Sequence, residues 1–427
     1  MTQRPRLAAP ALRLAPTCVA AGALLAAPTF AAAEDPNPYT LGVLETVTHD
    51  SNVFRAPSGT PIASDWIYTT GIVGTVDQPI GRERLKANAE FDYNKFGKQS
   101  QLDSTAHSVD IEGDWATVGR LSGEVGYSDS SQLYRYSLDV NTPLTARNTL
   151  DTRSGFARFH LGVVTKLTFD VALTGQQQEY SADIYRYRDQ NRWAGQAGIA
   201  YQSSPDLRTS LSFRHTRGDY PHYLQALDAS GALVSTPDHF TRNDVILGLS
   251  YNATGASTFN VNLSRAQEEH SVITNRSFHT WAADGRWTWT PTGRTQFSLD
   301  FLRDDDTGGE DTSFLGVPLT STDARRRTMV SGRISYEVSA KIQLTATGAY
   351  TKRDLDTAFS ELPQADVRGS DRLYQAGLGL NYLPTRNIRL GCNVSKEQRT
   401  VRGDAGSVVT YPYEDMLWSC TGQFAFN

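Results

Sequence analysis

Cysteine, methionine and long apolar runs are scarce in this sequence. Its 427 residues include only three cysteines and three methionines. After Ala33, no apolar run approaches the roughly 20 residues that a membrane-spanning helix needs. A mean hydropathy of −0.43 and a net charge of −5 also argue against a helical membrane protein and against a nucleic-acid binder. A membrane protein built from strands is not excluded, because barrel strands are short and alternate between polar and apolar residues.

The first 33 residues have the layout of a secretory signal peptide. Three early arginines supply a positive start, residues 18–27 form an apolar segment, and the alanines at 31–33 form a cleavage site. A buried N-terminal helix is the alternative. We therefore expect an exported protein in which residues 34–427 form a single domain.

The alternation of polar and apolar residues is clearest over residues 277–303. Trp287 and Trp289 fall on one parity, while Asp284 and Arg286 fall on the other. A Pro-Thr-Gly turn then leads into a second strand of the same kind. Successive side chains of a strand point to opposite faces, so this segment is a hairpin with one apolar and one polar face. Charges opposite tryptophans suit a barrel whose outside meets lipid and whose inside meets water.

This hairpin pattern recurs along the chain, with connections that are alternately short and long. Short turns such as Gln78–Gly81 and Pro384–Asn387 alternate with long connections such as 52–64 and 218–240. Outer-membrane barrels have tight periplasmic turns and longer external loops. The sequence therefore predicts an all-β fold, a transmembrane antiparallel up-and-down β-barrel of about 18 strands in the bacterial outer membrane. A soluble β-sandwich is the alternative.

The polar parity of the predicted strands indicates what the barrel does. It combines charges of both signs with many amides and hydroxyls, which is typical of a hydrated lumen, and a barrel of roughly 16–18 strands is wide enough for an aqueous channel. Each of these side chains has solvation of the wall as its alternative role. The predicted pore-lining residues are Lys86, Glu90, Asp92, Asp110, Glu112, Asp114, Arg158, Asp284, Arg286, Asp300, Arg333 and Arg389.

Aromatic and hydrogen-bonding residues mix in the predicted external loops. Such mixtures suit sugar rings, and they equally suit a girdle at the membrane interface or contacts with lipopolysaccharide. The predicted polysaccharide contacts are Tyr134, Tyr136, Tyr185, Tyr187, Tyr220 and Tyr223.

Motifs for catalysis are absent from the sequence. It contains no nucleophile motif, phosphate-binding loop, His-Glu-x-x-His or metal-spaced cysteine cluster, so we expect no enzyme, no cofactor and no metal site. An active site assembled at the rim from distant loops is the alternative. Cys392 and Cys420 lie about equally far from the middle of the last predicted loop, which makes them cross-strand neighbours facing lipid. Adjacent-strand geometry is often strained for a disulfide, so we expect two thiols rather than a bridge.

One region of the sequence is similar to a known family. Thr48-His49-Asp50-Ser51-Asn52-Val53-Phe54-Arg55 resembles the Asp-x-Asn-x-x-Arg segment of the type 2 beta-barrel porin group. Ser64-Asp65, the stretch from Asp77 to Leu85, and Leu102-Asp103 resemble its EpsL-type subgroup of outer-membrane proteins, encoded in exopolysaccharide biosynthesis operons. The resemblance implies a barrel associated with polysaccharide secretion, without catalytic residues. The motif residues Asp50, Asn52 and Arg55 either shape the first loop or contact a ligand.

The residues thus predict an aqueous outer-membrane channel, and the resemblance implies that it takes part in exopolysaccharide secretion. The expected partners are polysaccharide, outer-membrane lipid and lipopolysaccharide, and periplasmic components of a polysaccharide export machinery, with no nucleic acid. The alternatives are a general or sugar-selective diffusion porin, and a plugged barrel whose loops bind polysaccharide.

Overall fold

A computed structural model of the chain describes residues 38–134, 145–162, 166–227, 233–272, 277–305, 312–314, 317–319, 324–356, 368–403 and 411–426. The predicted signal peptide, residues 1–33, lies outside these ranges. Among the described residues, no helix is long and apolar enough to cross a membrane.

Eighteen strands form one antiparallel sheet, in agreement with the predicted number. The first nine are β1 (Tyr39–Asp50), β2 (Asp65–Ile80), β3 (Glu83–Phe96), β4 (Ser104–Ala116), β5 (Leu121–Leu133), β6 (Thr149–Leu161), β7 (Leu167–Tyr180), β8 (Gln190–Ser204) and β9 (Leu207–Leu227). The other nine are β10 (Leu233–Thr254), β11 (Ser257–His270), β12 (Phe278–Thr292), β13 (Thr295–Asp304), β16 (Ala324–Ser339), β17 (Ile342–Asp356), β18 (Arg368–Tyr382), β19 (Ile388–Gly403) and β20 (Tyr413–Phe426). Smaller elements are a hairpin of β14 (Thr312–Phe314) and β15 (Val317–Leu319), and the 3-10 helices η1 (Ser100–Leu102) and η2 (Asp183–Arg188).

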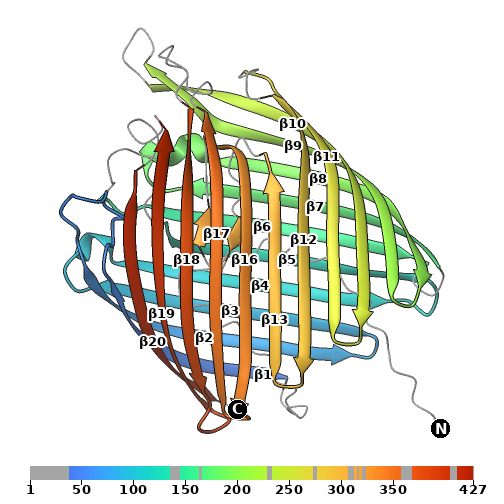
Figure 1. Ribbon diagram of the computed structural model, residues 1–427, viewed down its shortest axis with the longest axis horizontal. Helices are drawn as coiled ribbons and strands as arrows, with labels where there is room; N and C mark the ends of the chain where they lie inside the picture. Colours follow the sequence, from blue (N-terminus) through green and yellow to red (C-terminus); the bar gives the residue numbers. More distant parts are fainter. Residues whose placement is uncertain are drawn as a thin grey trace.

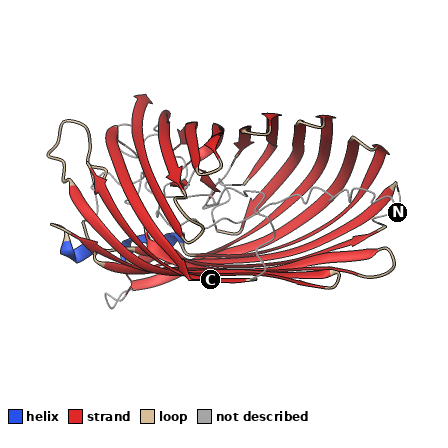
Figure 2. Cartoon of the chain, turned by 90° about the horizontal axis from the view of Figure 1, so that it is seen from below, coloured by secondary structure: helices blue, strands red, loops and turns tan. Residues whose placement is uncertain are grey.

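The sheet closes on itself through its first and last strands. β1 pairs with β2 along one edge and with β20 along the other, from Leu41 opposite Phe426 to Asp50 opposite Leu417. The other main strands pair with their neighbours along the chain, with β13 pairing directly with β16. Figure 1 and Figure 2 show the resulting curved wall from two directions. The predicted all-β, antiparallel, up-and-down barrel is confirmed.

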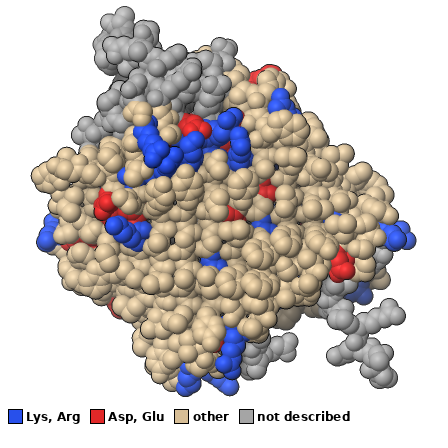
Figure 3. All heavy atoms as spheres, in the orientation of Figure 1, with Lys and Arg blue, Asp and Glu red and all other residues tan. Residues whose placement is uncertain are grey.

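One parity of side chains forms an apolar band around the outside of the barrel. Leu211, Leu247 and Leu263 are register partners on β9, β10 and β11, and all three are exposed. Figure 3 shows one face of this surface, where the middle is mostly uncharged and Lys and Arg gather toward the upper end. An exposed apolar band of this extent suits hydrocarbon rather than water. The barrel therefore spans the bacterial outer membrane, with its short turns on the periplasmic side and its long connections outside.

The prediction of a long loop at residues 218–240 is wrong over most of that segment. β9 and β10 continue to pair from Gly218 opposite Phe240 up to Leu227 opposite Leu233. Beyond the apolar band neither face of a strand meets lipid. The alternation of apolar and polar residues that marks the membrane-spanning part of each strand is therefore lost. Backbone pairing does not need that alternation and continues.

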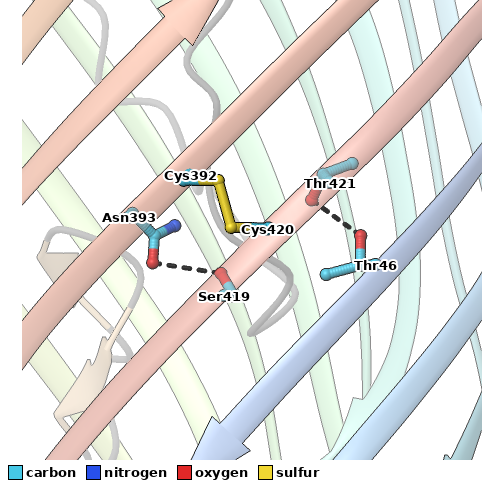
Figure 4. The surroundings of a disulfide bond; sticks show 6 residues. All are labelled: Thr46, Cys392, Asn393, Ser419, Cys420 and Thr421. Carbon is cyan, nitrogen blue, oxygen red and sulfur yellow. Dashed lines mark hydrogen bonds between the residues drawn. A yellow bond between two sulfur atoms is a disulfide. The ribbon is translucent and has the colours of Figure 1, made fainter.

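Cys392 and Cys420 form a disulfide, so the expectation of two thiols is wrong (Figure 4). The predicted register is right, since the two residues face each other across β19 and β20 with their Cα atoms 4.1 Å apart. Non-hydrogen-bonded pairs of antiparallel strands approach most closely, which brings their side chains together. The sulfur atoms are therefore within bonding reach without any change of register.

Replacing both cysteines with serine should lower the free energy of unfolding by about 3 kcal/mol. The bridge joins residues 28 positions apart and therefore restricts the unfolded chain. Urea unfolding of the reconstituted barrel, followed by tryptophan fluorescence, measures the change. Reduction of the wild-type protein should reproduce it, and an unchanged unfolding midpoint in both samples would contradict the prediction.

Glu45 interrupts the apolar outer band on β1. It lies on the outward parity between Val43 and Val47, and its register partners are Thr70 on β2 and Gly422 on β20. The Thr70 hydroxyl donates a hydrogen bond to Oε2 of Glu45 at 3.0 Å. A carboxyl group in this position faces hydrocarbon with one hydroxyl to solvate it.

Replacing Glu45 with leucine should therefore stabilise the folded barrel by about 1 kcal/mol, because acidic side chains on the lipid face are destabilising. The same urea titration in liposomes measures the effect. The matched control is Glu112→Leu on the lumen side, where the carboxylate is paired with Lys86 at 3.2 Å and its loss should not stabilise. Equal shifts in the two variants would contradict an outward position for Glu45.

Candidate functional site

The second parity of the strands faces the lumen, and all twelve predicted pore-lining residues fall on it. Three of them form one cluster on β3 and β4. Lys86 Nζ lies 3.2 Å from Oε1 of Glu112 and 3.0 Å from Oδ2 of Asp114. All three side chains are about one third exposed, which is typical of groups that face a hydrated space rather than a packed core.

Further lumen charges are paired across neighbouring strands. Arg158 lies 3.0 Å from Glu124, and its guanidinium carbon is 4.2 Å from the centre of the Phe156 ring. Arg286 is paired with Asp300 across β12 and β13. Asp284 accepts a hydrogen bond from the Asn262 side chain at 2.8 Å. These pairs hold the side chains against the wall and keep its surface polar.

The other five predicted lumen residues form no ion pair in the described part of the chain. The three acidic ones are Glu90, Asp92 and Asp110 on the neighbouring strands β3 and β4. The two basic ones, Arg333 and Arg389, lie on β16 and β19. Acidic side chains without an ion pair therefore gather on β3 and β4, whereas the two arginines are separated by β17 and β18.

Buried polar side chains gather at the external end of the barrel. Arg353 on β17, Asp371 on β18 and Arg399 on β19 are each at most 3% exposed, and Arg353 is ion-paired with Asp371. Such residues recur near the external ends of most described strands, while Gln343 and Asn381 are among the exceptions at the periplasmic end. The external end is thus packed with side chains, whereas the lumen wall below it is only half-buried.

The first long connection, residues 51–64, folds into this external end. Val53 and Phe54 are buried in a cluster with Phe96 and Leu102. Phe96 lies on the lumen parity of β3, opposite Ile67 of β2. This contact draws the start of the first loop onto the inner wall of the barrel.

The opposite edge of the first loop is tied to β20 and the segment before it. The backbone N–H of Ser51 donates to the carbonyl of Met416 at 3.0 Å, and that of Ser58 donates to the carbonyl of Pro412 at 2.8 Å. The first loop therefore covers the inner side of the sector formed by β20, β1, β2 and β3.

Arg55 holds the first loop in place through three carboxylates. Its Nη1 is 3.0 Å from Oδ2 of Asp50, its Nη2 is 2.9 Å from Oδ2 of Asp415, and its Nε is 3.6 Å from Oε1 of Glu397. These acids lie on β1, β20 and β19, the strands at the closing seam of the barrel. Burial lowers the pKa of Arg55, and the three carboxylates outweigh it and raise the pKa above its ordinary value. The backbone of Arg55 has φ 51°, which non-glycine residues rarely adopt, so these contacts hold a strained conformation.

Asn52 fixes the backbone on both sides of this ion-pair cluster. Its Nδ2 donates to the carbonyls of Glu414 at 3.0 Å and Ala56 at 3.2 Å, and its Oδ1 accepts from the N–H of Ala56 at 2.8 Å. Oδ1 of Asp50 accepts from the N–H of Asn52 at 2.9 Å. Asp50, Asn52 and Arg55 thus join the first loop to the seam, and all three are buried.

A second buried network lies on β10 and β11, beyond the apolar band. Nδ1 of His270 is 2.6 Å from Asp238, and Nε2 is 3.0 Å from Glu268. Burial lowers the pKa of His270, but these two carboxylates together raise it above its ordinary value and favour the imidazolium. Arg242 joins the network through Glu268 at 3.7 Å and extends it to Asp244 at 3.0 Å and Asp304 at 3.2 Å. The network links β10, β11 and β13 inside the external end.

Three of the tyrosines predicted to contact polysaccharide are buried. Tyr134, Tyr185 and Tyr220 are between 1% and 4% exposed. Tyr134 and Tyr185 pack on each other beside Tyr180, and the Tyr220 hydroxyl accepts a hydrogen bond from Gln190 at 2.9 Å. At these exposures no ring face is open to a sugar, so these tyrosines hold the external end together instead.

The remaining predicted loop contacts stay predictions. Tyr187 is half-buried, with the Arg188 guanidinium carbon 5.4 Å from its ring centre. Tyr136 and the side chain of Tyr223 lie outside the described residues. In the described part of the chain, no group of three or more His, Cys, Asp or Glu side chains is arranged to hold a metal ion.

No protein-family model and no curated protein matches this chain. Among solved structures, OccAB3 of Acinetobacter baumannii is similar with a TM-score of 0.47 and 13% identity, over 91% of this chain and 99% of that one. The outer membrane protein opdK of Pseudomonas aeruginosa has a TM-score of 0.46 and 10% identity over 91% and 99% of the two chains. A mutant of the ferric enterobactin receptor PfeA of Pseudomonas aeruginosa has a TM-score of 0.44 and 10% identity over 90% and 80%. The strand register and the apolar outer band, rather than these likenesses, establish the outer-membrane barrel.

Proposed function

We propose that this barrel is a diffusion porin for small hydrophilic solutes, with its narrowest part at the external end. The inward-folded first loop carries this proposal. Val53 and Phe54 press the loop onto the inner wall, and Arg55 ties it to the seam. Below the loop, paired charges such as Lys86 and Glu112 keep the wall wettable. Small solutes would pass such a wall in water, and the packed external end would limit their size.

Secretion of an exopolysaccharide, as the resemblance implies, is the alternative. Its motif residues Asp50, Asn52 and Arg55 are all engaged in holding the first loop against the inner wall, where it would narrow the passage for a polymer. Export would also require periplasmic partners that deliver the polysaccharide. The internal contacts of the motif therefore favour the diffusion porin.

Single-channel recording in planar bilayers tests the two functions. We expect steady ion conductance that purified exopolysaccharide leaves unchanged, together with swelling of liposomes in small neutral sugars. Dextran of matched length serves as the control polymer. A conductance that the exopolysaccharide, but not dextran, blocks from one face would favour export. A folded barrel without conductance would contradict both and indicate a plugged lumen.

A further inference from the structure

A small polar pocket opens on the lumen wall at the periplasmic end of β12, β13, β16 and β17. Its volume is about 160 Å³, and Gln296, Ser335, Glu337 and Gln343 line it together with the turn after β12. The strand register brings these residues side by side, with Gln296 opposite Ser335 and Glu337 opposite Gln343. All four lie on the lumen parity, so the pocket faces the channel and not the lipid.

Gln343 gives the pocket an acceptor without a donor. Its side chain is only 5% exposed, and its Oε1 accepts no hydrogen bond from the described residues. Buried polar atoms of native proteins are nearly always hydrogen-bonded, because leaving one without a partner costs its full desolvation. This oxygen is closed to solvent in the empty pocket, and a rotation of the Gln343 amide would turn it toward a solute whose hydroxyl group supplies the missing donor.

The lining selects for hydroxyl groups rather than for a net charge. Thr290 and Ser335 contribute hydroxyls, and Gln296 and Gln343 contribute amides, so the lining offers both donors and acceptors. One carboxylate, Glu337, and one guanidinium, Arg294, balance each other in charge. The volume is below the roughly 300–1,000 Å³ of pockets for drug-sized ligands, which limits the occupant to one small unit.

We propose that this pocket binds one neutral polyhydroxylated unit, either a free monosaccharide or one sugar of a longer chain. The proposal rests on the proposed function, because it names the class of solute that the channel passes. The pocket lies at the periplasmic mouth of the channel. A sugar taken up from outside would leave the channel there, and a sugar exported from the periplasm would enter it there. The pocket is weakly enclosed, so the sugar is held briefly and does not block the channel.

Saturation-transfer NMR on the refolded barrel in detergent micelles tests binding without any flux. D-glucose and maltohexaose are the two sugar probes, and D-glucuronate, which has nearly the size of glucose and one negative charge, is the charged probe. We expect transfer to glucose, and a loss of affinity of about tenfold in Gln343→Leu, which keeps the size of the side chain and removes the acceptor. Ser335→Ala, which removes one lining hydroxyl with little change in shape, should weaken binding in the same direction.

The matched control is Gln196→Leu, a lumen glutamine on β8 that is bonded to Ser212 at 3.0 Å, away from the pocket. Saturation transfer to maltohexaose alone would show that the site binds one unit of an oligosaccharide. Transfer to glucose would show that it binds the free monosaccharide. Transfer to D-glucuronate but to neither neutral sugar, or sugar affinities unchanged in both Gln343→Leu and Ser335→Ala, would overturn the proposal. Ion conductance of the same samples reports separately on the channel, so a conducting barrel that binds no sugar would overturn this inference alone.

Discussion

Replacing Arg55 with methionine should lower the free energy of unfolding by about 3–5 kcal/mol, the usual cost of removing one partner from a buried ion pair. Methionine fills the space of the side chain but leaves Asp50, Asp415 and Glu397 buried together without their cation. Those acids belong to the first strand and the last two strands, so their repulsion acts on the seam that closes the barrel. Urea unfolding in liposomes, or loss of heat-modifiable migration on gels, measures the effect.

Arg84→Met is the matched control for Arg55→Met. Arg84 is paired with Asp77 at the periplasmic end, and both side chains are 52% exposed. Exposed pairs contribute only about 0–1 kcal/mol, so this variant should unfold almost like the wild type. Similar shifts in the two arginine variants would show that the seam does not depend on Arg55.

Replacing Phe54 with serine should release the first loop from the inner wall. Truncating a buried aromatic ring costs about 3 kcal/mol or more, which shifts the ratio of docked to released loop by roughly a hundredfold. The channel should then show a higher mean conductance with more frequent fluctuations. Single-channel recording at fixed voltage measures both quantities.

Ile62→Ser provides the control within the same loop, because Ile62 is 61% exposed and contributes no packing of this kind. It should leave conductance and noise as they are in the wild type. If Phe54→Ser also left them unchanged, the first loop would not be the part that limits the channel.

The membrane-spanning part of the fold could be predicted from the sequence because lipid imposes a strict alternation on each strand. Segments such as β10, with Val245, Leu247 and Leu249 on one parity, show a period of two that neither a helix nor a loop produces. The lumen side of residues such as Lys86 and Arg389 follows from the same alternation. Where the strands leave the membrane the constraint ends, and the paired extension of β9 and β10 therefore could not be distinguished from a loop.

The external end could not be predicted because its contacts join residues far apart in the chain. Arg55 meets Asp415 and Glu397 only after the first strand pairs with the last, and neither acid's own strand marks it as a partner of the first loop. The signal that could have found them is the lumen parity, which both acids share near the external ends of β19 and β20. Tyr134 and Tyr185 have the composition of a sugar-binding surface, and only their packing reveals that they are buried.

Polymer exclusion from each side of a single channel tests the central claim most directly. Polyethylene glycols of increasing size are added to one face at a time. A polymer that enters the channel lowers its conductance, so the smallest polymer that no longer lowers it marks the width of that entrance. We expect larger polymers to enter from the periplasmic side than from the external side, and Phe54→Ser to reduce the difference. Equal limits on the two sides, or a narrower periplasmic entrance, would contradict a channel narrowed by its first loop.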